Sequence, residues 1–554
     1  MIFKSYVAKL KSEFSGYNLQ KLSKDLMAGL TVTAVALPLA LAFGVACGAT
    51  AEAGLVTAII AGLIMSALAG ASYQISGPTG AMSAILVGIV ASSGGMQSVF
   101  VVSVLAGIII LLCAVFKLGR LVSMIPRPVI TGFTSGIALT IALGQIDNFF
   151  GTTSVGSNPI EKIGSYFTNG FNLNWRALLI GAIVVLIMIV WPKKWGAKVP
   201  SSLVGIIVAT IISIIFGFGD KIALVGQIPQ KLILDERFQL SQIDWQNFGS
   251  YISPAFSIAA LALIESLLCG ASASKMKNEE FDANQEIIAQ GVGNVIVPFF
   301  GGVPATAAIA RTSVAIKSGA QTRLCGIIHA IGLLISMFVL APIMAKIPLS
   351  ALAGVLMVTA WRMNEWGEIK TIFSKKFIGG IVKFLATMIA TIVFDLTIAI
   401  VIGIVLSAFI YIYRSSSSTI TVKDIDEEKY GSVTNDTTKI IYIKGPVFFA
   451  NVGKLEKVFK EELHEVNELV ISLDGVSSID TSGTTALYEH IEHLRNENVK
   501  VILCGMSPSV LSMLNKLNIK ELVGENNIVE TTYEAIELTI DQEGTELITQ
   551  AEEI

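Results

Sequence analysis

Two stretches decide the fold: QISGPTGAMSA at residues 74–84 and GGVPATAAIARTSVAIKSGA at residues 301–320. In each, a proline (Pro78 or Pro304) follows residues that favour extended backbone and precedes an apolar run. Proline suits the first turn of a helix and disfavours helix before it, so both stretches are predicted to start a helix abruptly. The spacing between the prolines equals the spacing between residues 26 and 252, where two apolar halves of the chain begin. The alternative is a pair of ordinary proline-kinked helices.

The composition places most of the chain in a membrane. Of the 554 residues, 53% are hydrophobic and only 15% are charged, and the mean hydropathy is +0.70. Soluble domains carry about 25% charged residues. The 49 glycines suit tightly packed membrane helices. The net charge of −3 gives no support for nucleic-acid binding.

Residues 26–414 are predicted to form an all-α polytopic membrane domain of fourteen apolar segments, most of them near the length of about 20 residues that crosses a bilayer. The first seven segments are 26–47, 53–71, 79–94, 98–116, 122–144, 175–192 and 201–218. The second seven are 253–274, 284–300, 305–318, 324–344, 348–361, 378–394 and 397–413. An odd number of segments reverses the second copy, so 26–218 and 252–414 are predicted to form a 7+7 inverted repeat. The third and tenth segments are short for a complete span.

Loop charges orient this domain. With a cytoplasmic N-terminus, the cytoplasmic loops are rich in Lys and Arg, whereas the short outer loops 49–52, 95–97, 301–304 and 395–396 contain none. This is the positive-inside pattern. Residues 1–25 are polar and rich in lysine, so we expect a cytoplasmic segment without a cleavable signal. Both termini are therefore predicted to lie on the cytoplasmic side of the inner (plasma) membrane.

Half-helices that begin inside the membrane predict an anion site. Each helix N-terminus carries roughly half a positive charge and several unpaired N–H groups. The side chains at the two breaks are small or hydroxylic: Thr79, Gly80, Ser83, Thr306 and Ala307. Leu39 and Phe43, beside Pro38 in the first segment, are candidates for the pocket wall.

Two ionisable residues lie within apolar segments. Arg311 is in the tenth segment and Glu265 is in the eighth. Such residues cost about 2.5–3.5 kcal/mol at the bilayer centre, so they are functional candidates by default. Arg311 is predicted to attract the anion, and Glu265 to carry a coupling proton or contact a cation. The alternative is a buried ion pair between them that serves packing alone.

These stretches resemble the SulP (sulfate permease) anion transporters over nearly the whole chain. The resemblance is carried by residues 74–84 and by DLMAGLTVTAVALPLALAFGVACG (25–48), GFTSGIALTIALGQI (132–146), ALIESLLCGA (262–271) and QGVGNVIVPFFGGVPATAAIARTSVAIKSGA (290–320). It implies fourteen spans, core and gate domains, and a homodimer. Substrate is implied between the third and tenth helices, with walls from the first and eighth. Matching by motif selects Leu39, Phe43, Thr79, Gly80, Ala310, Arg311 and Glu265.

Within the family the chain looks closest to bacterial members that move C4-dicarboxylates with protons, and next to sodium-dependent bicarbonate carriers. Two departures bear on this. Animal relatives often have Gln where this chain has Leu39, so one polar contact is missing. The bicarbonate carriers have Asp-x-x-x-Thr in the eighth span, where this chain has Glu265 and Cys269. A thiol is a poor ligand for a hard cation, so proton coupling is favoured over sodium coupling.

After the serine run at 415–418 the chain becomes charged, and residues 420–541 predict a small α/β domain. Residues 542–554 form an acidic tail. The predicted strands are 439–443, 447–450, 469–473 and 500–504, and the predicted helices are 452–463, 482–496, 508–517 and 531–540. The region resembles the STAS domain, with Asp480-Thr481-Ser482-Gly483 as its signature. In the related anti-sigma-factor antagonists the matching serine is phosphorylated, which makes Ser482 a regulatory candidate. The alternative is helix capping by Asp480, Thr481 or Ser482.

Other motifs do not point to an enzyme. The chain contains no GxxxxGK[ST] phosphate loop. His490 and His493, three apart on a predicted helix, are better explained as a solvated helix face than as metal ligands. His329 is interpreted as a packing or hydrogen-bonding residue, and the five cysteines as buried hydrophobes. No cofactor or metal is predicted.

The sequence therefore predicts secondary active transport of a small anion of the sulfate, bicarbonate or C4-dicarboxylate class. Sodium-coupled bicarbonate carriage, anion exchange and an anion channel remain alternatives. A nucleobase carrier shares the repeat architecture but typically uses carboxylates where this chain has Arg311. A membrane anion receptor that signals through STAS, with a cytoplasmic protein partner, is the alternative from another functional class.

Overall fold

The structure is a computed structural model that describes residues 2–92, 95–117, 119, 125–156, 159–192, 199–228, 230–394, 396–416, 419–425, 437–463 and 466–539. The chain divides into two compact units, Met1–Val405 and Leu406–Ile554. The predicted acidic tail at 542–554 lies outside the described residues.

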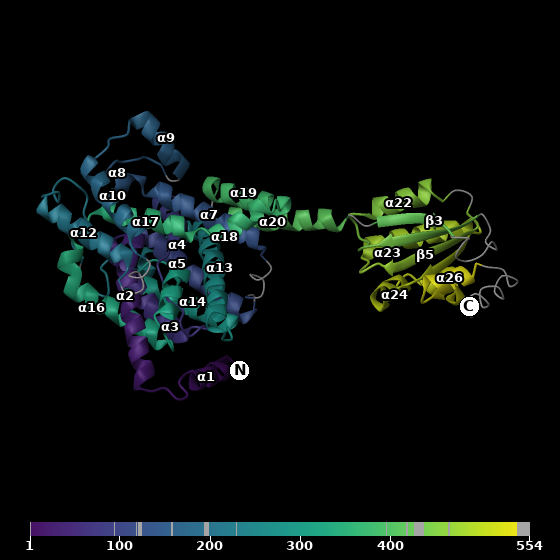
Figure 1. Ribbon diagram of the computed structural model, residues 1–554, viewed down its shortest axis with the longest axis horizontal. Coiled ribbons are helices and arrows are strands. Elements are labelled where there is room, and N and C mark those ends of the chain that lie inside the picture. The colour runs from purple at the N-terminus through teal and green to yellow at the C-terminus, as the bar shows by residue number, and fades with distance from the viewer. Residues whose placement is uncertain are drawn as a thin grey trace. The chain divides into compact units, whose positions relative to one another are not determined.

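The first unit is built from helices packed around one large core (Figure 1). Its first half contains α1 (Ile2–Glu13), α2 (Leu19–Ala46), α3 (Ala51–Leu68), α4 (Gly80–Ser92), α5 (Met96–Val115), α7 (Arg127–Gly144), α8 (Ile146–Phe150), α9 (Pro159–Asn169), α10 (Trp175–Val190) and α12 (Ser201–Ile215). The second half contains α13 (Ile252–Lys277), α14 (Ala283–Ile296), α15 (Ile309–Lys317), α16 (Leu324–Met344), α17 (Leu349–Met363), α18 (Trp366–Ser374), α19 (Ile378–Val393) and the first part of α20 (Leu396–Ser415), which continues past Val405. Short 3-10 helices are η1 (Leu240–Gln242), η2 (Phe248–Tyr251) and η3 (Val297–Phe300).

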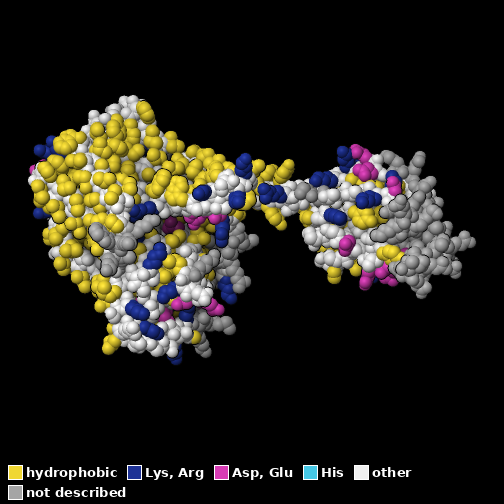
Figure 2. All heavy atoms as spheres, in the orientation of Figure 1, with side chains coloured by type: hydrophobic (Ala, Val, Ile, Leu, Met, Phe, Trp, Pro, Cys, Tyr) yellow, Lys and Arg dark blue, Asp and Glu magenta, His cyan; other side chains and the backbone are white. Residues whose placement is uncertain are grey.

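The described helices fit a membrane protein. By length and composition, 7 are long and apolar enough to cross a membrane: Leu19–Ala46, Ala51–Leu68, Met96–Val115, Arg127–Phe150, Phe248–Ser274, Leu324–Met344 and Ile398–Ser415. Shorter apolar helices cover Gly80–Val90, Trp175–Val190, Ser201–Ile215, Leu349–Met363 and Ile378–Val393. Figure 2 shows hydrophobic side chains covering much of one face of this unit. Large apolar residues on α10, α12 and α16 are exposed, such as Ile189, Ile211 and Val339, as expected where lipid replaces water.

Every predicted apolar segment contains a described helix, but α2 and α15 start elsewhere than expected. Helix α2 begins at Leu19, seven residues before its predicted segment. The tenth segment does not begin its helix at Pro304, because α15 starts only at Ile309. The residues between take extended backbone: β2 (Thr306–Ala307) pairs antiparallel with β1 (Ser76–Gly77). The helix of the third segment starts at Gly80, close to the prediction.

Close packing fixes α2 against its neighbours. A Cβ on Gly44 would lie 2.8 Å from the backbone nitrogen of Gly54, so only glycine allows α2 and α3 to approach this closely. At the other end of α2, the buried Asp25 carboxylate accepts hydrogen bonds from the N–H groups of Gln321 (2.6 Å) and Thr322 (3.1 Å). This contact joins α2 to the segment between α15 and α16.

Helix α1 is held by a buried ion pair. Arg323 Nη2 lies 2.7 Å from Glu13 Oε2, with side-chain exposures of 4% and 6%. Tyr6 also donates a hydrogen bond to the Ala67 carbonyl (2.5 Å). Breaking one partner of such a pair costs several kcal/mol, about 3–5, because the other charge stays buried.

The second unit contains a five-stranded sheet in the order β3-β4-β5-β6-β7. The strands are β3 (Thr419–Asp424), β4 (Thr438–Lys444), β5 (Glu468–Gly475), β6 (Lys500–Cys504) and β7 (Ile528–Val529). The helices of this unit are α22 (Val452–Glu461), α23 (Thr481–Asn496), α24 (Pro508–Asn515), α25 (Ile519–Val523) and α26 (Thr532–Glu537), with a 3-10 turn η4 (Glu525–Asn527). β3 pairs antiparallel with β4, and the other pairs are parallel.

Successive side chains of a strand point to opposite faces of the sheet, and helices pack against both faces. Leu469, Ile471 and Leu473 join the core of α22, α23, α24 and α25. Val470 packs on the opposite face with Ala535 of α26. The predicted strand 447–450 is wrong: only Val447 makes an isolated bridge, to Ile479, because the chain turns into α22 there. The sequence analysis did not predict β3, β7 or α25.

Candidate functional site

The site centres on the break where β1 meets β2. Ser76 pairs with Ala307 and Gly77 with Thr306. Because the strands are antiparallel, α4 and α15 start at opposite ends of this two-residue ladder. Among the described residues, the N–H groups of Gly80 and Ala81 have no hydrogen-bond partner, nor do those of Ile309, Ala310 and Arg311. Two helix N-termini with unpaired donors therefore face one small region.

Polar residues of α14 hold this break in shape. Asn294 clamps Ala305 by donating to its carbonyl (2.9 Å) and accepting from its N–H (2.8 Å). Gln290, one turn earlier, donates to Ser76 Oγ (3.0 Å). These contacts satisfy backbone and side-chain groups that would otherwise be costly at membrane depth.

Arg311 is 1% exposed and lies across β1. Its Nη2 donates to the Pro78 carbonyl at 2.5 Å. Its Nη1 is buried and has no hydrogen-bond partner among the described residues. A Cβ on Gly77 would lie 2.5 Å from Nη1, so any side chain at this position would displace the guanidinium group. A buried, charged donor without a partner is costly, and a bound anion would satisfy it.

Glu265, on α13, is half-buried and accepts a hydrogen bond from Thr79 Oγ1 at 3.0 Å. None of the ion pairs between described residues joins Glu265 to Arg311. Instead the two charges hold adjacent residues of one segment, Arg311 at Pro78 and Glu265 at Thr79. A change at either charge can therefore reach the start of α4.

Phe43 and Gly80 meet at the wall of the site. A Cβ on Gly80 would lie 3.1 Å from Phe43 Cε1 and 3.4 Å from Ile141 Cγ1. Leu39 is buried one turn before Phe43 on α2, at 7% exposure. Ala310 is exposed at the first turn of α15. Phe43, Thr79, Gly80, Glu265 and Arg311 thus surround the break, with Leu39 and Ala310 at its margins.

Thr306 faces α13 in this structure. Its hydroxyl lies 2.8 Å from Ser266 Oγ and donates to the Ala262 carbonyl at 3.3 Å, and the residue is fully buried. Its predicted contact with a ligand stays a prediction. The residues that the sequence analysis missed are Ser266, Gln290 and Asn294. Gln290 and Asn294 are four apart in a segment read as uniformly apolar, and this helical spacing was the available signal.

In the second unit, Asp480 is the N-cap of α23. Its Oδ1 accepts from the Gly483 N–H (2.8 Å) and its Oδ2 from the Phe449 N–H (3.1 Å). Ser482 is exposed in the first turn of this helix. The His490 ring stacks on Phe459, with 4.7 Å between centroids. Among the described residues there is no cluster of three or more His, Cys, Asp or Glu that could hold a metal ion.

The fold and the site define a multi-pass membrane transporter that carries a small α/β domain. Residues 22–387 match the Sulfate permease family, and residues 430–535 match the STAS domain. The chain belongs to the sulfate permease family, and it is a transporter rather than an enzyme.

Relatives extend over almost the whole chain. The Bacillus subtilis (strain 168) protein YvdB is 33% identical over 535 residues, covering 94% of this chain and 98% of YvdB. The bicarbonate transporter BicA of Synechocystis sp. (strain ATCC 27184 / PCC 6803 / Kazusa) is 29% identical over 538 residues, covering 93% and 94%. The predicted closeness to C4-dicarboxylate members stays a prediction.

Two solved structures resemble this one. The transmembrane domain of a cyanobacterium bicarbonate transporter BicA has a TM-score of 0.64 and 32% identity, covering 70% of this chain and 98% of that chain. The overall structure of SLC26A9 has a TM-score of 0.81, covering 98% and 93%. Its identity of 18% makes this a likeness of fold alone.

Proposed function

We propose that the chain is a secondary active transporter of small anions, of the sulfate, bicarbonate or C4-dicarboxylate class, in the plasma membrane. The observation that carries the proposal is the buried Nη1 of Arg311, which has no partner among the described residues. The Arg311 side chain reaches from the first turn of α15 to Pro78, two residues before α4. The anion would accept hydrogen bonds from this nitrogen and from the first N–H groups of α4 and α15. Phe43 and Leu39 would form the wall.

The coupling ion is proposed to be a proton on Glu265. The carboxylate now accepts a hydrogen bond from Thr79, beside the carbonyl that Arg311 holds. A bound anion would offset the positive charge of Arg311 and so favour the protonated, neutral form of Glu265. Anion and proton would therefore bind together. A sodium site is disfavoured because Cys269 is 1% exposed and its thiol donates to Thr312 Oγ1 at 3.3 Å.

Transport is proposed to follow alternating access. The start of α4 packs against the Ile141 side chain of α7 at Gly80. Sliding or rocking at such a contact would expose the site to one side and then the other. The same proposal includes a homodimer, a cytoplasmic position of both termini, and regulation at Ser482 through a protein partner of the STAS domain.

The substrate remains within one chemical class. A single guanidinium nitrogen and helix N–H groups suit any small oxyanion or carboxylate. The likeness to bacterial and cyanobacterial relatives, BicA among them, supports bicarbonate and sulfate as the first compounds to test.

Uptake into proteoliposomes tests the proposal. Labelled sulfate, bicarbonate, and fumarate or succinate are offered with and without an imposed pH gradient. Accumulation of one anion that rises with an inward proton gradient is the expected result. Stimulation by sodium would support the sodium-coupled alternative, and flux that never exceeds equilibrium would support an exchanger or a channel. Binding without any flux would support a receptor and contradict the proposal.

A further inference from the structure

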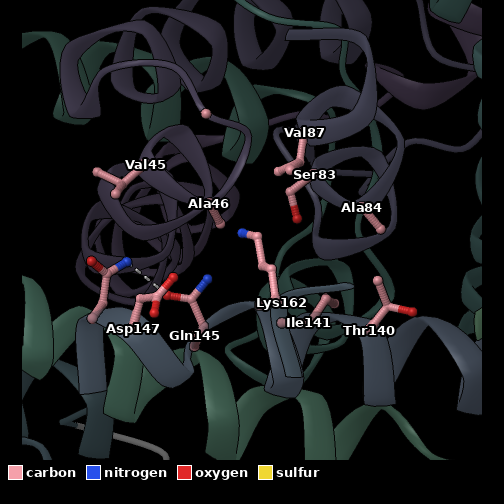
Figure 3. A pocket seen from close by; sticks show the side chains of 13 residues that line it. Val45, Ala46, Ser83, Ala84, Val87, Thr140, Ile141, Gln145, Asp147 and Lys162 are labelled. Atoms are coloured by element: carbon pink, nitrogen blue, oxygen red, sulfur yellow. Dashed lines mark hydrogen bonds between the residues drawn. The ribbon is translucent and has the colours of Figure 1, made fainter. Parts of the chain in front are cut away.

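A cavity lies next to the proposed site. Its volume is about 240 Å³, and it is bounded by the C-terminal end of α2, the first turns of α4, the C-terminal end of α7 with α8, and one side chain of α9. Figure 3 shows that side chain, Lys162, reaching into the space with its amino group directed towards Ala46 and Ser83.

Lys162 is the one basic residue that lines the cavity, and it forms no ion pair with any described residue. The acidic residue of the lining, Asp147, is already engaged. One of its oxygens accepts from Ser154 Oγ (2.5 Å) and the other from the Tyr166 hydroxyl (2.9 Å). Asp147 keeps its negative charge, because both donors are neutral hydroxyls, but none of the ion pairs between described residues joins it to Lys162. The half-buried amino group of Lys162 can therefore still contact a ligand.

Gln145 adds a polar group to the same wall. The residue is 5% exposed, and its side-chain oxygen accepts from Asn148 Nδ2 at 3.4 Å. Its amide nitrogen is directed into the cavity (Figure 3). A cationic group and an amide donor thus face one space that is large enough for a small oxyanion.

Ile141 connects this cavity to the break. The residue lines the cavity, is 5% exposed, and its Cγ1 would lie 3.4 Å from a Cβ on Gly80. The Phe43 ring lies against the same position. Two apolar side chains therefore separate the cavity from Thr79, Glu265 and Arg311.

We propose that this cavity is an outer capture site for a small anion, in which Lys162 attracts the anion before Ile141 and Phe43 move aside. This rests on the proposed function and on a cytoplasmic N-terminus, which places the C-terminal ends of α2 and α7 outside. A charge in a cleft with low-dielectric walls concentrates counter-ions and raises on-rates about tenfold or more. Such an effect weakens as salt shortens the Debye length from about 30 Å at 0.01 M to about 8 Å at 0.15 M.

The test compares Lys162→Gln and Lys162→Arg with Lys221→Gln, in vesicles of known orientation. Lys221 is an exposed lysine beyond α12 that does not line the cavity, so it controls for removal of a charge. In low salt, Lys162→Gln is expected to raise the KM for external anion about tenfold with unchanged kcat. Lys162→Arg and Lys221→Gln should stay within about twofold of the wild type, and the difference should shrink at 0.15 M salt.

Chemical modification keeps the test independent of folding. Lys162→Cys in one folded preparation is treated from outside with a thiol reagent that adds an ammonium group or with one that adds a sulfonate. The ammonium should restore the KM, and the sulfonate should raise it further. Equal KM values after both reagents, or an equal loss for external and internal anion, would overturn the capture site. Absence of any flux in the wild type would instead contradict the proposed function itself.

Discussion

Replacing Arg311 with alanine removes the guanidinium whose Nη1 is proposed to bind the anion. A hydrogen bond to a charged group contributes about 1.5–3 kcal/mol, which corresponds to about a 10- to 100-fold loss of anion affinity. The same change leaves the buried Pro78 carbonyl without its 2.5 Å donor, which costs about 1–3 kcal/mol of stability. Both effects have to be measured separately.

The assay is uptake of the transported anion into proteoliposomes, with reconstituted protein quantified and its folding checked by size-exclusion chromatography and thermal unfolding. Lys317→Gln is the matched control, because it removes an exposed cation at the other end of α15. Arg311→Lys should give intermediate activity, since one ammonium does not reproduce the planar fork that serves Pro78 and the anion together. Arg311→Ala protein that is folded and takes up anion at the wild-type rate would refute the assignment.

Three further changes probe other parts of the account. Glu265→Gln should keep exchange of labelled for unlabelled anion but lose pH-driven accumulation. The amide can still accept a hydrogen bond from Thr79, but it cannot bind and release the coupling proton. Accumulation driven by a pH gradient alone would contradict this. Gly80→Leu should reduce uptake at least tenfold, since even its Cβ would clash with Ile141 and press on Phe43; normal uptake by protein that passes the same folding checks would argue against a site at this wall. Asp480→Ala removes an N-cap worth about 1 kcal/mol, so amide exchange across α23 in the full chain should become about fivefold faster; unchanged exchange would show that the cap contributes little.

The sequence contained enough to predict the apolar helices and the two breaks, because apolar length and proline act locally. It placed the start of α15 too early, since the repeat offset carried the Pro78 pattern onto Pro304. What moves that start to Ile309 is a pairing between Ser76–Gly77 and Thr306–Ala307, more than two hundred residues away in the chain. Such a contact leaves no local signal.

The candidate site, too, was predictable where the signal is local and not where it depends on long-range contacts. Arg311 and Glu265 were visible as charges within apolar segments, but their partners were not. The sequence suggested a direct ion pair as the alternative, whereas the structure joins them through the adjacent Pro78 and Thr79. The cavity near Lys162 was missed because it combines helix ends with α9, which lies in a loop where no membrane pattern applies.

Protection of one engineered cysteine would show whether a transported anion binds at the break between β1 and β2. Ala310→Cys places a thiol at an exposed position of the first turn of α15, next to Arg311. The native cysteines are buried or, for Cys113, half-buried, and mass spectrometry assigns the labelled thiol. The account predicts that a saturating concentration of the transported anion slows alkylation of this cysteine, and that an anion which is not transported has no effect. Alkylation at the same rate with and without the transported anion, in protein that still transports it, would contradict the account.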